Sequence, residues 1–207
     1  MFQNRHKTIY LTLCSILQES KMMEKSNIEI LRKFAKSTNR SIVDKEIPYP
    51  LTGIRTFQKY KRMIYVPNNP ENTSYFIWFS DPYAKVGFPT IFSGAFIPLS
   101  TRIKSRINIR NTNILDRLNI FSKTKNNKFG NDHFDSKVVI SGTVDNSIKR
   151  LLSQYRIQDQ LLKALNIEKY INISLNEYKI DFVPEFKGIP YLSIINPQSW
   201  DLERNDI

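Results

Sequence analysis

This chain of 207 residues has few of the residues from which many protein classes build their sites. It contains one cysteine, Cys14, so a single copy forms no internal disulfide and its stability does not depend on an oxidising compartment. With only two histidines besides, a structural zinc site lacks its usual ligands. The six glycines form neither a phosphate-binding loop nor a dinucleotide fingerprint. No apolar run reaches the roughly 18 residues that a membrane-spanning helix needs.

Negative charge is also scarce. The chain has 31 lysines and arginines against 19 acidic residues, a net charge of +12. Such an excess favours nonspecific attraction to nucleic acid or to anionic lipid. Isoleucine, asparagine and lysine are all abundant, however, and AT-rich coding DNA produces that composition without selection for a partner. Both explanations of the charge stay open.

Residues 1–22 match no later pattern. Arg5 to Leu17 has a charged and then an apolar part, as a signal peptide does, but Thr12, Cys14 and Ser15 interrupt the apolar part and no small-residue cleavage site follows. We therefore expect a dispensable mobile tail, or an upstream start with Met23 as the working one, and a cytoplasmic protein.

Residues 23–50 predict a helix and a linker. Ser26 and Glu29 have the spacing of a capping box, and Ile28, Leu31, Phe34 and Ala35 form one apolar face. Asn39 is suited to end the helix in a left-handed conformation. The prolines after Ile47 and Tyr49 favour an extended linker over 47–50, and a single domain is expected over 51–197.

Strand patterns begin at Leu51 and continue to Arg110. We expect strands over 54–60, 62–66, 74–80, 91–97 and 101–110. The strand over 74–80 is apolar on both faces, which predicts a central position, and Asp81-Pro82 should end it. Gly94 between flanking prolines places the strand over 91–97 at an edge or a bulge.

The stretch from Asp132 to Ile195 predicts a strand, helices and three more strands. Alternation of apolar and polar residues over 134–140 indicates a strand. Asp145 or Asn146 can cap a helix after it. The apolar face of that helix does not continue past its first turns, which predicts a break and a second helix that Ser153 can cap. Asn176-Glu177 is expected to join strands 171–175 and 178–182 in a hairpin that pairs Ile173 with Ile180. A further strand follows over 189–195.

The same stretch resembles a bacterial domain family to which no activity is assigned. The residues that carry the resemblance are His133-Phe134-Asp135, Val138 to Gly142, Asp145, Leu151-Leu152 and the strand pairs up to Phe182. The resemblance covers about the last third of the chain and implies a fold in which a strand, a leucine-rich helix and a hairpin follow one another. Members of that family are often membrane-tethered, and the resemblance implies no catalytic residue.

A basic stripe is the main candidate binding feature. If 101–110 is one strand, its isoleucines face the core and the cations Arg102, Lys104, Arg106 and Arg110 stand on the opposite face. A polar segment with further cations follows, and the full set of possible polyanion-binding residues is Arg102, Lys104, Arg106, Arg110, Arg117, Lys123, Lys125 and Lys128. The alternative is a solvated sheet face.

Catalytic chemistry has weaker support. His133 lies among Asp132 and Asp135, but in a strand at most one of these aspartates faces the histidine. No nucleophile elbow, metal site or cofactor site is expected. An enzyme would have to rely on carboxylates assembled across the fold.

These patterns together predict an α+β protein. We expect an antiparallel sheet from residues 51–110 and 134–195, with helices packed against it and a helix before it. The expected function is a non-enzymatic binding or interaction protein that needs no cofactor. Its partner stays open among a protein, nucleic acid and an anionic membrane surface. The alternatives are binding of nucleic acid or of an anionic membrane surface through the basic strand, and a carboxylate-based enzyme.

Overall fold

The computed structural model describes residues 27–48, 60–69, 71–85, 88–101, 103–113, 116, 128–168 and 170–197. The expected tail over 1–22, the strand segment 54–59 and most of the segment 114–127 lie outside these residues. Two compact units divide between Ile42 and Val43.

The first unit contains a helix over residues 27–37, as the capping box predicted, although Ser26 itself lies outside the described residues. Ile28, Leu31 and Ala35 are buried. Asn39 adopts a φ of 54°, which confirms the predicted left-handed end. The amide of Arg40 then donates to the carbonyl of Ala35 at 2.8 Å, which satisfies one of the last helical carbonyls.

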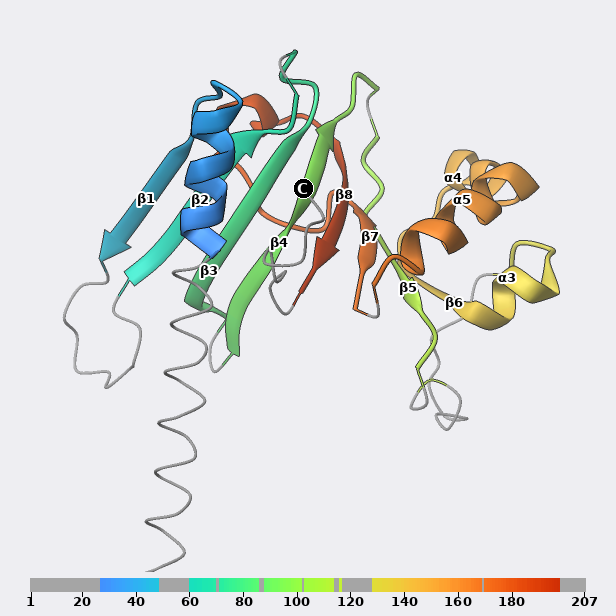
Figure 1. Ribbon diagram of the computed structural model, residues 1–207. Helices are drawn as coiled ribbons and strands as arrows, with labels where there is room; N and C mark the ends of the chain where they lie inside the picture. The colour runs from blue at the N-terminus through green and yellow to red at the C-terminus, as the bar shows by residue number, and fades with distance from the viewer. Residues whose placement is uncertain are drawn as a thin grey trace, which may run out of the picture. The chain divides into compact units, whose positions relative to one another are not determined.

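The second unit is built on one eight-stranded sheet, which confirms the α+β class (Figure 1). The strand order is β1-β2-β3-β4-β8-β7-β5-β6, and every neighbouring pair is antiparallel. The strands are β1 (Val43–Pro48), β2 (Tyr60–Pro67), β3 (Tyr75–Lys85), β4 (Phe88–Pro98), β5 (Ile107–Asn111), β6 (Val138–Gly142), β7 (Asn172–Leu175) and β8 (Tyr191–Asn196).

The N-terminal half of the sheet departs from the expected pattern at its ends. Ile47 and Pro48 belong to β1, which pairs with β2, so the linker predicted over 47–50 is in part an edge strand. Strand β3 is central, as its two-sided apolar pattern predicted. It does not end at Asp81-Pro82 but runs to Lys85, with a shift of register between Asp81 and Lys85.

Strand β4 lies inside the sheet, so its predicted edge position is wrong. It pairs with β3 on one side and with β8 on the other. A Cβ atom at Gly94 would lie 2.1 Å from the carbonyl oxygen of Ile194. The glycine therefore marks a close approach of two backbones rather than an exposed edge.

The hairpin predicted around Asn176-Glu177 does not form. Asn176 does adopt a positive φ of 53°, but residues 178–182 contain no strand. Ile173 instead lies opposite Ile109 of β5 and Ile194 of β8. The alternation of Tyr178, Ile180 and Phe182 reflects packing of an irregular segment against the sheet, because burial on one side selects apolar residues without requiring strand pairing.

The strand predicted from Phe134 begins only at Val138. Residues Asp132–Lys137 form helix α3, whose first amides at His133 and Phe134 donate to the Asn131 side chain at 3.1 and 3.3 Å. Phe134 and Val138 are also four residues apart, a helical spacing, so their burial fits either period. The cap provided by the Asn131 side chain favours the helix over the strand.

The two short helices after β6 are confirmed. Helix α4 (Asn146–Leu152) is capped by Asp145, which accepts the Ile148 amide at 2.9 Å, and helix α5 (Tyr155–Leu165) follows after a break. Ser153 does not cap α5 as predicted. Its hydroxyl donates to the carbonyl of Lys149 at 2.9 Å, and Gln154 is the N-cap residue instead.

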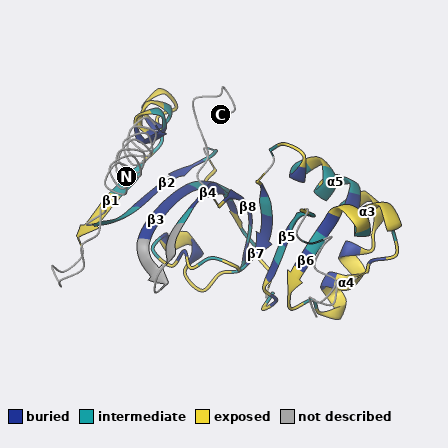
Figure 2. Cartoon of the chain, turned by 90° about the horizontal axis from the view of Figure 1, so that it is seen from below, coloured by how far each residue is buried: buried dark blue, intermediate teal, exposed yellow. Residues whose placement is uncertain are grey.

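Two separate cores lie on opposite faces of this sheet. Residues directly opposite one another share a face, so Ile140, Ile109, Ile173 and Ile194 form one row, which packs with residues of α3, α4 and α5. Figure 2 shows these helices together at the β5–β6 end. The other face carries the aromatic core of β3, β4 and β8, which packs with the segment 178–186 and its 3-10 turn η1 (Pro184–Phe186).

Candidate functional site: a pocket beside the basic segment

The predicted basic stripe is not one strand. Strand β5 begins at Ile107, so Lys104 and Arg106 lie in the irregular segment before it, and both are exposed. Ser105 explains the irregularity, because its buried hydroxyl donates to the Asp145 cap of α4 at 2.5 Å. Lys128 is exposed elsewhere, and the remaining predicted cations, Arg102, Arg117, Lys123 and Lys125, lie outside the described residues.

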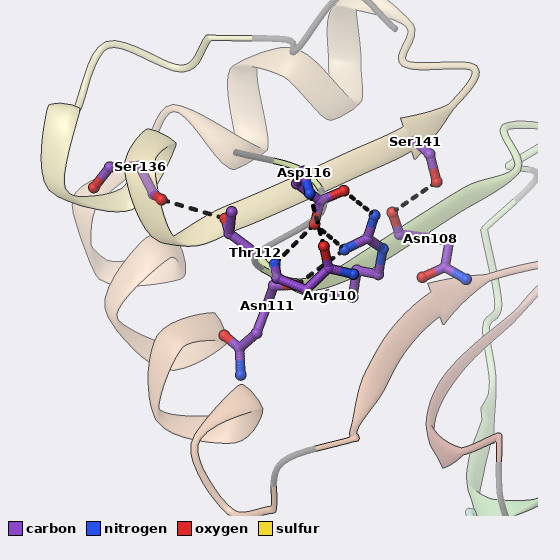
Figure 3. Close-up of polar contacts among 8 residues, drawn as sticks. Asn108, Arg110, Asn111, Thr112, Asp116, Ser136 and Ser141 are labelled. Atoms are coloured by element: carbon purple, nitrogen blue, oxygen red, sulfur yellow. Dashed lines mark hydrogen bonds and ion pairs between the residues drawn. The ribbon is translucent and has the colours of Figure 1, made fainter. Parts of the chain in front are cut away.

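Arg110 does lie on β5, but it is bound to a carboxylate (Figure 3). Its Nη1 and Nη2 donate to the two carboxylate oxygens of Asp116 at 2.6 and 2.7 Å. This fork lowers the pKa of Asp116 to about 2 and raises that of Arg110. Asp116 is fixed further by Asn113, whose amide donates to it at 2.8 Å. Arg110 is therefore neutralised within the fold and does not present a free charge to a phosphate.

The residues around Arg110 tie the end of β5 to the helices. Asn111 donates to the carbonyl of Leu165 at the end of α5, at 2.9 Å. The Thr112 hydroxyl donates to the carbonyl of Ser136 in α3, at 3.2 Å (Figure 3). The first bond is half-buried and the second is exposed, and both join parts of the chain that are distant in sequence. The cluster is best explained as structural.

A pocket of about 430 Å³ lies where the segment 103–106 meets the segment 176–191. Most of its wall is apolar, with one cation and one carboxylate. The lining residues are Ile103, Lys104, Asn176, Ile180, Asp181, Phe186, Gly188, Ile189, Pro190 and Tyr191. Lys104 is thus a predicted site residue that the structure places in the wall of this pocket.

Asn176 assembles this pocket. Its side-chain amide donates to the carbonyls of Ile103 and Ser105, both at 3.0 Å, and its side-chain oxygen accepts the Tyr191 amide at 2.9 Å. Its positive φ turns the chain away from β7. One residue therefore holds together segments about 70 positions apart. The sequence showed Asn176 only as a turn residue, because its long-range partners leave no local pattern.

Tyr191 of the pocket wall and its neighbour Tyr178 have structural roles. The Tyr191 hydroxyl donates to the Tyr178 carbonyl and accepts the Tyr178 amide at 2.5 Å. Burial raises the pKa of Tyr178 to about 12, with a contribution from Glu177, and burial also raises that of Tyr191. Both phenols are therefore neutral near pH 7.

The charged groups of the pocket are available to a ligand. Within the described residues, neither Lys104 nor Asp181 takes part in an ion pair. The apolar wall includes Phe186, which is buried, and Ile189, which is 42% exposed. The pocket thus combines an apolar surface with a lysine ammonium and a carboxylate.

The histidine and carboxylates at 132–135 lie on the short helix α3 and not on the strand that the sequence predicted. Asp135 accepts the Phe129 amide at 3.0 Å, and His133 is exposed. In the described part of the chain, no three His, Cys, Asp or Glu side chains are placed to hold a metal ion. Within the same residues, no helix is both long enough and apolar enough to cross a bilayer.

Comparison with known proteins adds no relative. No family model, curated protein or solved structure matches the chain. The resemblance of residues 132–195 to a bacterial domain family stays an expectation from the sequence.

Proposed function

We propose that this chain is a non-enzymatic binding protein that holds an apolar ligand with an anionic group in the pocket between segments 103–106 and 176–191. One observation carries the proposal: an apolar wall contains the unpaired ammonium of Lys104. The volume of about 430 Å³ suits a small organic molecule or a short side-chain cluster of a partner.

The division of roles follows from the lining. Contact with Ile180, Phe186 and Ile189 removes apolar ligand surface from water, which supplies most of the affinity. Lys104 orients the anionic end, because a charged hydrogen bond is directional where the apolar contact is not. Asp181 repels a second negative charge, so a ligand with a single anionic group is favoured over a polyanion.

Binding is favoured over catalysis by what lines the pocket. Among its described residues there is one carboxylate, Asp181, and no histidine, serine or cysteine. The Tyr191 hydroxyl is engaged by Tyr178, and its raised pKa makes it a poor proton donor or base near pH 7. A reaction that needs a general acid and a general base has no such pair here.

Two fluorescent probes with nearly the same aromatic body test this proposal. Anilinonaphthalene sulfonate carries one negative charge, and phenylnaphthylamine carries none. The wild-type protein should bind both and prefer the sulfonate. Lys104→Met should weaken the sulfonate by about three- to tenfold and leave the neutral probe unchanged, as expected for loss of one partly exposed charge contact.

Two further variants separate the pocket from nonspecific charge. Lys179→Met removes an exposed lysine that does not line the pocket and should change neither affinity. Ile189→Asn should weaken both probes, because it removes apolar wall, and it should leave the fold intact because the side chain is 42% exposed. Equal effects of Lys104→Met and Lys179→Met on the sulfonate would refute the proposal.

A further inference from the structure

An exposed apolar and basic corner lies at the junction of α4 and α5. Leu151 is 44% exposed and Tyr155 is 77% exposed. Lys149, Arg150 and Arg156 lie beside them and are exposed. The run from Asn146 to Gln158 contains no acidic residue. Together, Lys149, Arg150, Leu151, Tyr155 and Arg156 form what we call the α4–α5 corner.

Helix geometry explains why these side chains face outward. Ile148 and Leu152 of α4 are buried against the sheet, and Arg150 lies two positions from each, on the far side of the helix. In α5, Gln158 is buried and Arg156 lies two positions before it. Leu151 is the last but one residue of α4 and Tyr155 is the first residue of α5, so both stand beside the turn between the helices.

The corner is held rigidly by a buried side chain. Gln158, which is 2% exposed, donates to the carbonyl of Leu152 at 2.8 Å and accepts from the side-chain amide of Asn131 at 2.7 Å. The first bond satisfies a carbonyl at the end of α4, and the second ties α5 to the N-cap of α3. The backbone that carries the apolar and basic groups is therefore already ordered, and binding of a partner does not have to order it.

The cations of the corner are free to bind. Among the described residues, Lys149, Arg150 and Arg156 take part in no ion pair, whereas Lys163 on the same helix is bound to Asp159 at 2.8 Å. Three unpaired cations around two exposed apolar side chains have the composition of an interfacial lipid-binding surface. A nucleic acid would use the cations but would gain little from Leu151.

We propose that the α4–α5 corner docks on an anionic lipid surface. Leu151 and Tyr155 enter the headgroup region. The apolar ring of Tyr155 is favourably placed there because its hydroxyl still reaches water. Lys149, Arg150 and Arg156 bind the negatively charged headgroups. This surface is separate from the pocket, and the inference does not rest on the function proposed for the pocket.

Co-sedimentation with vesicles tests the docking. One vesicle preparation is phosphatidylcholine alone, and the other is equal parts of phosphatidylcholine and phosphatidylserine. The wild-type chain should sediment with the anionic vesicles and not with the neutral ones. The double variant R150Q/R156Q should weaken this binding by about 25-fold, at about fivefold for each cation. The double variant L151S/Y155S should also weaken it, although the charge is unchanged.

Matched variants control for charge and for apolar exposure elsewhere. K179Q/K187Q removes two other exposed cations, and I167S/Y170S removes two other exposed apolar side chains, 70% and 45% exposed. Neither should change the binding by more than about twofold. Circular dichroism checks that each variant is folded.

Three outcomes would overturn the inference. The first is a wild-type chain that does not sediment with anionic vesicles at low salt. The second is an effect of the control variants as large as that of the corner variants. The third is a pair of results that would indicate a surface for polyanions in general. In that case L151S/Y155S would leave vesicle binding intact, and R150Q/R156Q would reduce retention on single-stranded DNA as much as retention on vesicles.

Discussion

Single residues make well-defined contributions to the stability of this fold, and the ion pair of Arg110 with Asp116, six positions further along the chain, is one example. The two-pronged bond lowers the pKa of Asp116 from its ordinary 3.8 to about 2. The folded state therefore binds its proton less readily than the unfolded state does. The stabilisation is fully present above about pH 4 and is lost as the pH falls through about 2.

Asp116→Asn should thus destabilise the protein by about 1–2 kcal/mol at pH 7, a range that allows for the 23% exposure of the carboxylate side chain. Urea unfolding at several pH values measures the difference from wild type, which should shrink below about pH 4. Asp159→Asn is the control, because its pair with Lys163 is well exposed and its loss should change the stability much less. A loss that stays constant down to pH 2 would contradict the assignment.

Gly94 illustrates a steric constraint on stability rather than an electrostatic one. Gly94→Ala should cost about 3 kcal/mol or more, because the new Cβ would meet the Ile194 carbonyl, which is backbone and cannot turn away. Gly130→Ala should cost only about 1–2 kcal/mol, the penalty for its φ of +82°, since nothing lies within 4 Å. Thermal and urea unfolding compare the two. The reverse order would mean that β4 and β8 are not packed at this distance.

At the scale of the element, the sequence predicted several helix ends and strands, but it did not predict strand pairing, helix α3 or the irregular segment 178–182. The caps at Asp145 and Asn39 and the break between α4 and α5 were recognised because helix ends depend on residues close in sequence. Strand β7 was recognised from its alternation, but its partner was not. Alternation reports which face is buried, and it contains no information about which distant strand lies alongside.

The charges of the candidate site could be predicted from the sequence, but its long-range contacts could not. The charges of Lys104 and Arg106 were evident from composition, whereas the pocket wall comes from segments far apart in the chain. Arg110 was predicted as part of a binding stripe, and only the fold shows its bond to Asp116. Asn176 was missed as the residue that assembles the pocket because its bonds reach residues 103, 105 and 191.

The pairing of β7 with β8 can be tested by a cross-link. The hydroxyls of Ser174 and Ser193 lie 2.7 Å apart on directly opposite residues, so cysteines at these positions should form a disulfide in a background in which Cys14, the only native cysteine, is replaced by serine. Oxidation should protect both thiols from alkylation and stabilise the chain by about 3 kcal/mol.

The matched control distinguishes the observed sheet from the hairpin that the sequence suggested. In that hairpin, Ser174 would lie opposite Lys179. Cysteines at 174 and 179 should therefore stay reduced under the same oxidation. Efficient cross-linking of this second pair, with none between 174 and 193, would show that the hairpin forms after all.

At the scale of the whole sheet unit, two cores share one layer of backbone. Phe134 belongs to the core under the helices, and Phe186 belongs to the aromatic core on the opposite face. Phe134→Leu and Phe186→Leu should each cost about 1 kcal/mol, and their effects should add, because the two side chains share no contacts. Urea unfolding should show a single transition for all variants, since neither core is complete without the shared sheet.

A pair within one core is the control for this additivity. Phe96 and Phe186 lie edge to face with ring centroids 6.3 Å apart. Phe96→Leu and Phe186→Leu should therefore be non-additive when combined, because each removes part of the other's contact. Equal coupling in both pairs would mean that the two cores are not independent.

The position of β8 has a consequence for synthesis on the ribosome. This strand comes last of the eight in the sequence, yet it lies between β4 and β7 in the sheet. A growing chain therefore makes two incomplete sheets, β1 to β4 and β5 to β7, before it makes the strand that joins them. Until then the inner edges of β4 and β7 have unpaired backbone groups, and such edges readily pair with other chains. The newly made chain is most vulnerable to aggregation in this interval, and chaperones that shield strand edges would have their greatest effect there.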